Sequence, residues 1–397
     1  MPNAIYIAGS GVISAIGSTL QENFQNLIAS KTGVGSFRIL PTQHATTLPA
    51  AEVQFTNEEL AERAKLPATT SRTALLSSIA AHEAIKNSGL DLSKLRCAFI
   101  SANTVGGMDK TENFFVDFLK DPQSGHLHQV VHHDCGAATE IVAKQLGIRH
   151  YVSTLSTACS SSVNSMMVGA RLIRSGKIDV AVCGGADALC RFTLNGFKSL
   201  MILDEQPCKP YDENRKGLNL GEGAGYVVLV SEKIAATLSK PATVRVSGYA
   251  NTNDAFHQTA SSPEGKGNYL AMAGALAMAN LQPADIDYIN LHGTGTGNND
   301  VSEGTAVMRL FGDRLPKLSS TKPYTGHTLA ASGAIEAAYS ILAIENGVVF
   351  PNLRFQTPMK ELHFSPQQQL EYLPVHHVLS NSFGFGGNCS SIIFSKS

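Results

Sequence analysis

The 397-residue sequence lacks the patterns of several large classes of protein. Its formal net charge is only -1, which argues against a protein whose main partner is nucleic acid or an anionic membrane. No uninterrupted apolar stretch approaches the roughly 20 residues that span a bilayer. The N-terminal residues also lack the charged and apolar regions of a signal peptide. We therefore expect a cytoplasmic protein.

Cysteine pairs and nucleotide-binding patterns are also missing. The seven cysteines are odd in number, and no two of them form a CxxC pair. This usage is typical of a reducing compartment and disfavours both a disulfide framework and a zinc site. The GxxxxGK[ST], GxGxxG and GxSxG patterns are absent, which argues against a nucleotide loop and an α/β-hydrolase. We expect neither a metal nor a nucleotide cofactor.

Short β-branched runs alternate with helical patterns along the chain, and this alternation indicates an α/β protein. The strands expected from these runs cover residues 4–8, 97–101, 180–183, 226–230, 286–291, 377–380 and 391–394. No linker-like or low-complexity segment divides the sequence. Periodicity alone therefore gives the class of the fold and leaves its domain organisation open.

An internal repeat relates two halves of the chain. Residues 81–107 and 272–297 share an alanine-rich helix, a leucine, a short spacer, a strand and a loop rich in glycine and threonine. Two further pairs of similar segments follow in the same order. We interpret them as an ancient duplication, with an N-terminal half at residues 1–240 and a C-terminal half at residues 241–397.

The stretch STACSSSVNSMMVGA places Cys159 just before a predicted helix. The apolar residues at 163, 166, 167, 170 and 173 have the spacing of a buried helix face, and Gly176 follows as a C′ residue. The preceding HYVSTLS is strand-like. Unpaired backbone N–H groups and the helix dipole at such a turn favour a thiolate. A buried structural thiol is the alternative, because cysteine is among the most buried residue types.

Three glycine-containing stretches of the C-terminal half carry further candidates. NLHGTGTGNND places His292 at the end of a strand, ahead of Thr294 and Thr296. SSTKPYTGHTLAASGAIEAA carries Lys322 and His327 at the start of another helical run. NSFGFGGN is a glycine-rich loop after a strand. Taken singly, a histidine is usually structural and such a loop is usually a turn.

In this order and spacing, the motifs resemble those of the β-ketoacyl-acyl-carrier-protein synthases of the thiolase superfamily. The resemblance covers nearly the whole chain and includes KPYDENRKGLNLGEGAGYVVL. It implies the thiolase-like, duplicated five-layer αβαβα fold, in agreement with the repeat. It also implies an elongating enzyme for the decarboxylative Claisen condensation of malonyl carrier protein with an enzyme-bound acyl group, in fatty acid or polyketide and polyene biosynthesis.

The resemblance assigns roles to individual residues. Cys159 is the nucleophile that carries the acyl chain. His292 and His327 match the two histidines that act on enolate charge, and Lys322 matches a lysine that organises the site. The backbone N–H groups of Cys159 and Phe385 match the oxyanion hole, and the Phe385 ring matches the gate. The remaining matches are Thr294 and Thr296, which bind the phosphopantetheine arm, and Asp300 and Glu336, which support the site.

Two other functions stay open. A non-elongating partner subunit that shapes chain length typically lacks the cysteine, which this chain keeps. A thiolase that acts on coenzyme A esters needs a second cysteine near the C-terminus, and Cys389 is the candidate. An initiating synthase is disfavoured, because the position of His327 would hold asparagine in such an enzyme.

The resemblance also predicts partners. The substrates are carried on the phosphopantetheine of an acyl carrier protein, so no separate cofactor is expected. The chain is expected to form a homodimer, or a heterodimer with a related subunit, with a loop at residues 104–115 contributing to the partner's acyl pocket. Asp109, Lys110 and Thr111 in that loop leave a polyene or polyketide substrate open. Arg63, Lys65 and Arg72 are the candidates for binding the acidic carrier protein.

Overall fold

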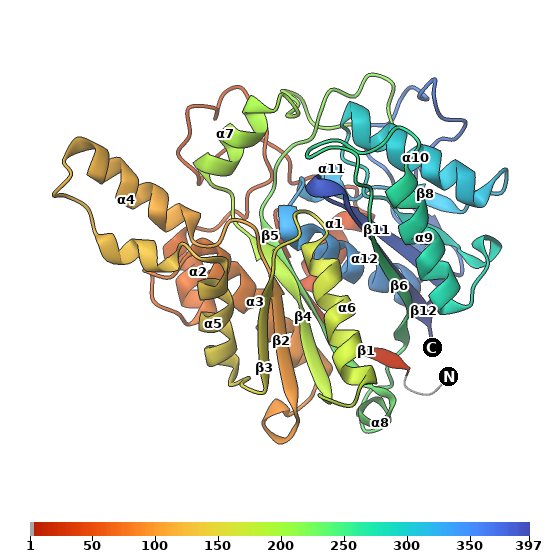
Figure 1. The fold of residues 1–397 in the computed structure, drawn as a ribbon, viewed down its shortest axis with the longest axis horizontal. Helices are drawn as coiled ribbons and strands as arrows, with labels where there is room; N and C mark the ends of the chain where they lie inside the picture. Colours follow the sequence, from red (N-terminus) through yellow and green to blue (C-terminus); the bar gives the residue numbers. More distant parts are fainter. Residues whose placement is uncertain (1–3) are drawn as a thin grey trace.

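The structure, a computed structural model, describes residues 4–397 and shows a sheet of ten strands with helices on both faces (Figure 1). The strands of the N-terminal half are β1 (Ile5–Ser14), β2 (Cys97–Ala102), β3 (Tyr151–Leu155), β4 (Val180–Asp187) and β5 (Gly223–Ser231). Those of the C-terminal half are β6 (Val244–Asn253), β7 (Tyr288–Asn290), β8 (Lys317–Ser319), β11 (His377–Phe383) and β12 (Asn388–Lys396). A second, two-stranded sheet pairs β9 (Val348–Val349) with β10 (Glu371–Tyr372).

The two halves of the large sheet have the same topology. Its strand order is β3-β2-β4-β5-β1-β6-β12-β11-β7-β8. The strand order of the second half is the reverse of that of the first half, and the two halves pair at β1 and β6. In the first half, β2 runs parallel to β3 and β4, and β5 runs antiparallel to β4 and β1. In the second half, β7 runs parallel to β8 and β11, and β12 runs antiparallel to β11 and β6. The duplication expected from the sequence is visible in this topology, whereas the boundary at residue 240 stays a prediction.

The helices form three layers around the strands. The first layer, α2 (Asn57–Ala64), α3 (Arg72–Ser88) and α5 (Cys135–Leu146), covers the N-terminal strands. The outer layer on the other side, α9 (Lys266–Ala279) with α10 (Gly297–Phe311) beside it, covers the C-terminal strands. Between them, α6 (Ser161–Arg174) and α12 (Ser332–Asn346) contact strands of both halves. The three layers of helices and the two sets of strands, one from each half, together make five layers.

The two central helices approach each other closely because of their small residues. Every residue of α12 from Ser332 to Ile344 is buried, as expected for a helix without a polar face. A Cβ atom added at Gly333 would lie 2.4 Å from Val163 of α6, so only glycine fits there. The Ala334 N–H also donates to the Ser162 hydroxyl at 2.9 Å. This crossing brings the N-terminal ends of α6 and α12 together, and with them the two turns that precede these helices.

The remaining elements are α1 (Leu20–Ile28), α4 (Met108–Lys120), α7 (Arg191–Ser199), α8 (Glu232–Ala235) and α11 (Lys322–Thr325), with short 3-10 turns at Leu92–Lys94, Leu127–His132, Pro283–Asp285, Leu329–Ala331 and Phe385–Gly387. Helix α4 projects from the body of the molecule (Figure 1). No helix among residues 4–397 is long and apolar enough to cross a membrane.

The structure corrects two sequence-based expectations. The seven predicted strands are present with shifted ends, but β6, β8 and the two short strands β9 and β10 were not predicted. The expected loop at residues 104–115 is wrong in its second part, because α4 begins at Met108. Asp109 and Lys110 there do not line the cavity around Cys159. The Asp109 carboxylate accepts from the Arg72 N–H, and the Lys110 ammonium donates to the Ala68 carbonyl.

Candidate active site

Cys159 lies in the tight turn between β3 and α6. It is buried, and the residue before it, Ala158, has a φ of 53°, in the left-handed region that non-glycine residues rarely adopt. A left-handed residue at this point lets the chain reverse from strand to helix within residues 156–160. The sulfur is thereby presented at the N-terminal end of α6, where the sequence pattern placed it.

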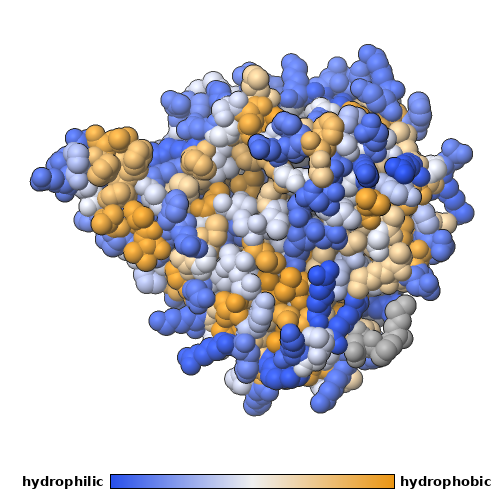
Figure 2. Space-filling view, in the orientation of Figure 1, coloured by the Kyte–Doolittle hydropathy of each residue, from blue (hydrophilic) through white to orange (hydrophobic). Residues whose placement is uncertain are grey.

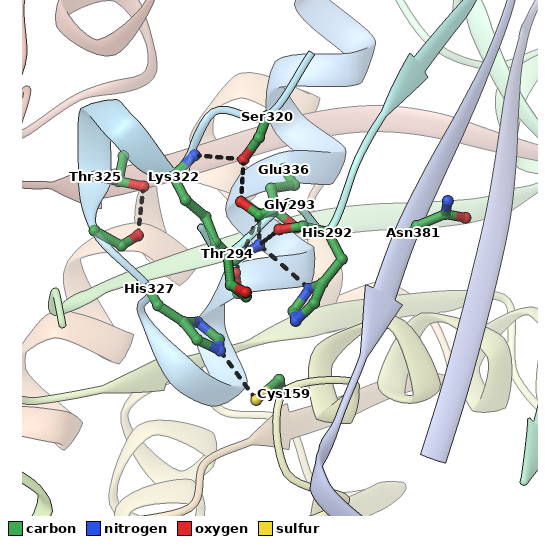
Figure 3. A network of polar contacts seen from close by, with 12 residues as sticks. Cys159, His292, Gly293, Thr294, Ser320, Lys322, Thr325, His327, Glu336 and Asn381 are labelled. Carbon is green, nitrogen blue, oxygen red and sulfur yellow. Dashed lines mark hydrogen bonds and ion pairs between the residues drawn. The ribbon is translucent and has the colours of Figure 1, made fainter. Parts of the chain in front are cut away.

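His327 lies in the corresponding turn of the C-terminal half, between β8 and α12. Its Nε2 is 3.0 Å from the Cys159 sulfur (Figure 3). The Leu329 N–H donates to His327 Nδ1 at 3.3 Å, so Nδ1 is an acceptor. A neutral imidazole has one acceptor and one donor nitrogen. The proton of His327 is therefore on Nε2, and this N–H points toward the nucleophile.

His292 completes the catalytic group from the end of β7. Its ring stands edge-on to that of His327, with ring centroids 5.4 Å apart and an interplanar angle of 85°. The Lys322 ammonium lies 3.3 Å from His292 Nδ1 and donates to the His292 carbonyl at 2.5 Å. An ammonium has donors only, so Nδ1 of His292 is also an acceptor and its proton is on Nε2.

Lys322 is fixed by a buried ion pair. Its ammonium lies 2.6 Å from the Glu336 carboxylate, and both side chains are almost fully buried. The Ser332 hydroxyl donates to the same carboxylate oxygen at 3.2 Å, and the other oxygen of Glu336 has no hydrogen-bond partner among the described residues. Lys322 begins α11 and Glu336 lies on α12, so the pair ties the histidine turn to the central helix (Figure 3).

Burial keeps the catalytic group uncharged. Loss of hydration lowers the pKa of His292 and His327 well below the usual value, and the Lys322 cation adds to this effect. Burial also raises the pKa of Cys159 to about 11, although Lys322 and the backbone N–H groups of Phe385 and Cys159 act in the opposite direction. The thiolate expected at a helix N-terminus is thus outweighed by burial, and the resting nucleophile is a thiol beside neutral imidazoles.

The glycine-rich loop lies directly against the nucleophile turn. A Cβ atom added at Gly384 would lie 3.1 Å from the Cys159 backbone nitrogen, which is tighter than ordinary contact. The next residue is Phe385, whose N–H stabilises the sulfur together with the N–H of Cys159. Two backbone donors therefore act on the Cys159 sulfur. The Phe385 ring stacks on Phe197, with centroids 5.8 Å apart.

A cavity of about 150 Å³ leads from Cys159 to the surface. Thr294 and Thr296 line it, with their hydroxyls 2.9 Å apart, as the sequence placed them. Met201, whose side chain is 88% exposed, and Lys216, which is also exposed, lie on its outer wall. Apolar side chains and hydroxyl groups line the cavity together, which suits a partly polar substrate arm.

Two buried carboxylates hold the threonine loop. Asp300 accepts from the N–H groups of Thr294, Gly295 and Tyr211, at 3.1, 3.2 and 2.8 Å, so it supports the loop rather than facing solvent. Glu303, which the sequence analysis did not single out, accepts from the N–H groups of His292 and Gly293 at 2.9 and 2.8 Å. Its signal was available, since Glu303 lies one helical turn beyond Asp300 on the same face of α10.

Asp187 is a second supporting residue that the sequence analysis missed. Its carboxylate accepts from the N–H groups of Thr104 and Val105, at 2.8 and 3.1 Å, and from Ala330 at 2.8 Å. It therefore joins a loop of the N-terminal half to the turn that follows His327. Burial raises the pKa of Asp187 to about 6.

The catalytic group does not suit a metal ion, although one ligand atom from each of Cys159, His292 and His327 lies within 4.8 Å of the others. A metal would need both Nε2 atoms as bare acceptors. The Leu329 N–H and the Lys322 ammonium occupy the two Nδ1 atoms, which keeps a proton on each Nε2. Binding would require both tautomers to be reversed beside a buried ammonium.

Two other sequence-based candidates are located elsewhere. Cys389 is not among the residues that line the cavity with Cys159. Its thiol instead donates to the Asn268 side chain at 3.1 Å. Arg72 is buried and forms an ion pair with Glu222 at 2.6 Å, so its assignment to a carrier-binding surface is wrong. The sequence could not reveal this, because Glu222 is distant along the chain. Arg63 and Lys65 are exposed, and their role stays a prediction.

Fold and site together define a thiolase-like condensing enzyme. The solved structure described as the ishigamide ketosynthase/chain length factor superposes with a TM-score of 0.93, at 30% identity over the whole of both chains. A second structure, of a type II polyketide synthase acyl-carrier protein in complex with its ketosynthase, superposes with a TM-score of 0.90 at 25% identity, again over both whole chains. The expected fold class is confirmed.

Sequence comparisons give the same family. The domain described as "Beta-ketoacyl synthase, N-terminal domain" matches residues 3–235, and its C-terminal counterpart matches residues 243–356. The 3-oxoacyl-[acyl-carrier-protein] synthase 2 of Staphylococcus aureus (strain COL) is 31% identical over 406 residues, which cover 99% of this chain and 98% of that protein. The chain belongs to the β-ketoacyl synthase family. It is a condensing acyltransferase, as the sequence motifs predicted.

Proposed function

We propose that this chain is an elongating β-ketoacyl-acyl-carrier-protein synthase. The observation that carries the proposal is the group formed by Cys159, His292 and His327, with the sulfur 3.0 Å from His327 Nε2, at the inner end of a cavity lined by Thr294 and Thr296. An arm that enters past the threonines brings a thioester carbonyl to the sulfur. Two histidines, rather than a histidine and an asparagine, favour elongation over initiation.

Acyl transfer is the first half-reaction. The Cys159 sulfur forms a bond to the acyl carbon, and the thiol of the carrier arm leaves with the proton that Cys159 gives up. The tetrahedral oxyanion between these steps accepts from the N–H groups of Cys159 and Phe385. Because burial makes Cys159 a thiol at rest, its deprotonation is coupled to attack, and the nearby Lys322 cation stabilises the developing thiolate.

Condensation is the second half-reaction. The malonyl group loses carbon dioxide, and the electron pair of the broken C–C bond forms an enolate whose oxygen accepts from the Nε2–H groups of His292 and His327. The enolate carbon then attacks the acyl–Cys159 carbonyl, a C–C bond forms and the C–S bond breaks. The products are a 3-oxoacyl carrier protein, carbon dioxide and the Cys159 thiolate, which takes a proton from water to restore the resting thiol.

We also propose partners for the chain. The relatives named above include a carrier-protein synthase and a ketosynthase complexed with its acyl-carrier protein, which supports a carrier protein as the substrate carrier here. Strand β3 is at one edge of the large sheet, and Tyr151 on it is exposed. The arm around α4 is apolar on its surface (Figure 2), with exposed Phe115, Val116, Phe118, Leu119, Leu127 and Val131. A second copy, or a related subunit, fits this face.

The remaining expectations are part of the same proposal. No step above uses a metal or nucleotide, and the phosphopantetheine of the carrier supplies the only prosthetic group. The cytoplasm is the proposed location. A non-catalytic partner subunit is the second candidate function, because one similar structure is described as a ketosynthase with a chain length factor. The buried Cys159 and its two histidines favour the catalytic member of such a pair.

One experiment tests the proposal. The chain is incubated with octanoyl carrier protein, and intact and peptide masses are measured before and after malonyl carrier protein is added. We expect an octanoyl mass on Cys159 that disappears as 3-oxodecanoyl carrier protein forms. An unmodified Cys159 with a panel of short, long and polyene acyl carriers contradicts catalysis and leaves the partner-subunit function.

A further inference from the structure

A polar cluster lies next to the nucleophile turn and, among residues 4–397, forms no hydrogen bond to either histidine. At its centre, the Asn388 side-chain oxygen accepts three hydrogen bonds: from the Ser160 hydroxyl at 2.6 Å, from the Asn251 amide at 2.7 Å and from the Asn164 amide at 3.1 Å. Ser160 directly follows Cys159. The cluster thus reaches the nucleophile turn through one bond.

The main chain of Asn388 reaches the other half of the oxyanion site. Its carbonyl accepts from the Gly384 N–H at 2.8 Å and closes the glycine-rich loop that contains Phe385. One residue therefore holds both segments that supply the backbone donors, its side chain holding the Cys159 segment and its main chain the Phe385 segment. The distance between the two N–H groups depends on where Asn388 is fixed.

Asn388 is itself held from several elements. Asn251 on β6 also donates to the Ser390 hydroxyl at 2.8 Å, and Ser390 donates to Asn164 on α6 at 2.9 Å. Asn164 in turn donates to the Thr157 hydroxyl at 2.9 Å, within the nucleophile turn. The left-handed Ala158 between Thr157 and Cys159 is a conformation that persists only where surrounding contacts over-determine it. This cluster supplies contacts on both sides of Ala158, to Thr157 and to Ser160, and Ser161 binds the Ala158 carbonyl.

The histidines are held by different residues. His292 depends on Lys322 and Glu303, and His327 depends on the Leu329 N–H, and none of these contacts includes Asn388. We propose that Asn388 is a positioning residue that sets the separation of the Cys159 and Phe385 N–H groups, so that it acts on the steps that pass through the tetrahedral oxyanion and not on malonyl decarboxylation. The inference rests on the proposed function.

The test exploits the acceptor role of Asn388. Asn388→Leu keeps a similar volume and removes the acceptor, whereas Asn388→Asp keeps an acceptor for the same three donors. The rate of octanoyl transfer to Cys159 is measured by mass spectrometry in a single turnover. Carbon dioxide release from malonyl carrier protein is measured separately without an acyl donor. Asn346→Leu is the matched control, since it removes an asparagine hydrogen bond at the far end of α12.

We expect Asn388→Leu to slow acyl transfer by about tenfold to a hundredfold, because small displacements of an oxyanion donor have effects of this size. Decarboxylation should stay within about twofold of the unaltered chain, and Asn388→Asp should restore most of the transfer rate. Asn346→Leu should change neither rate. Melting temperatures of all variants show whether a loss comes from unfolding.

Three outcomes overturn the inference: unchanged transfer in Asn388→Leu, an equal loss of both activities in folded protein, or an Asn388→Asp variant no better than Asn388→Leu. If the leucine variant does not fold, Ser160→Ala removes the same bond from the other side and is held to the first two criteria. Failure of the proposed function is distinguishable, because the unaltered chain would then not acylate Cys159 at all.

Discussion

Cys159 and His327 occupy equivalent positions in the two halves of the chain, each between the third strand of its half and a central helix. The nucleophile turn comprises residues 156–160, between β3 and α6, and the histidine turn comprises residues 320–331, between β8 and α12. Each contains a non-glycine residue with positive φ, Ala158 at 53° and Leu329 at 52°. The duplicated topology thus accounts for the meeting of the sulfur and the imidazole.

The turns differ in what holds them. The histidine turn is longer and contains Lys322, which is anchored to Glu336 of its own half. The nucleophile turn contains no charged residue. Asn164 of its own half donates to it, but the groups that act on the sulfur and on Ser160 include three from the other half: the Lys322 cation, the Phe385 N–H and the Asn388 side chain. In the proposed mechanism, the N-terminal half therefore supplies the reacting atom and the C-terminal half supplies the groups that activate it. The two halves thus share one topology but differ in the roles of the side chains in their equivalent turns.

Removal of the nucleophile should have the largest effect, because it removes the role of the N-terminal half and leaves the groups of the C-terminal half in place. Cys159→Ala is expected to abolish condensation, because no covalent acyl intermediate can form. Carbon dioxide release from malonyl carrier protein should continue, since both histidines and Lys322 belong to the C-terminal half. The two products are measured in parallel by chromatography and by trapped carbon dioxide. Condensation at the normal rate by the alanine variant would remove Cys159 from the mechanism.

Removal of either histidine acts on the opposite half-reaction. His292→Ala and His327→Ala should each lower the rate of decarboxylation by about a hundredfold to a thousandfold, the usual effect of losing one donor to a developing anion. Octanoyl transfer to Cys159 should fall less. The measurement is the ratio of the two rates in each variant. A larger loss in transfer than in decarboxylation for both variants contradicts the assignment of these residues to the enolate.

The dependence of Cys159 on Lys322 predicts a pH profile. With a pKa near 11, the thiolate fraction of Cys159 rises about tenfold for each pH unit between pH 7 and 10, so alkylation by iodoacetamide should accelerate without a plateau in that range. Lys322→Ala removes a nearby cation that favours the thiolate, which raises the pKa further and slows alkylation at every pH. A plateau near pH 7 would mean that the helix end outweighs burial.

The sequence predicted the central side chains of the site better than the carboxylates that hold the surrounding loops. Cys159, His292, His327 and Lys322 come together as expected, because their motifs lie at strand ends that the topology gathers at one edge. Glu303 was not predicted although its spacing from Asp300 offered a signal, and Asp187 was not predicted because a buried carboxylate that accepts from backbone N–H groups has no short local pattern of its own. Arg72 was misplaced for a related reason: its partner Glu222 is distant in sequence, and an unpaired arginine in a sequence resembles a surface cation.

The mouth of the cavity combines both halves, and charge there affects binding rather than chemistry. Lys216 lines the mouth, is exposed, and forms no ion pair among residues 4–397. Lys216→Glu should raise the KM for an acidic acyl carrier protein by about threefold to tenfold and flatten its salt dependence, with kcat nearly unchanged. The double variant Arg63→Glu, Lys65→Glu is compared at the same salt concentrations. Iodoacetamide alkylation of Cys159 should be unaffected by either change.

If Lys216→Glu leaves the KM unchanged while the double variant raises it, the carrier binds at the surface around α2 and not at the cavity mouth. If neither changes the KM, association does not depend on these charges, and the basic-patch prediction fails in both forms.

The smallest expected effect concerns the left-handed residue of the nucleophile turn. Ala158→Gly relieves a backbone strain of about 1–2 kcal/mol in the folded state, and the greater freedom of glycine stabilises the unfolded state by about 0.4–1 kcal/mol. The free energy of unfolding should therefore stay the same or rise by up to about 1.6 kcal/mol. The same substitution in a right-handed helix, Ala170→Gly in α6, should lower stability by about 0.5–1 kcal/mol, because it adds the glycine penalty without relieving strain. The measurement is a comparison of the melting curves of the two variants under identical conditions. An equal loss of stability in both would mean that the backbone at Ala158 is not strained. The polar cluster around Asn388 would then not be needed to hold a strained residue in place.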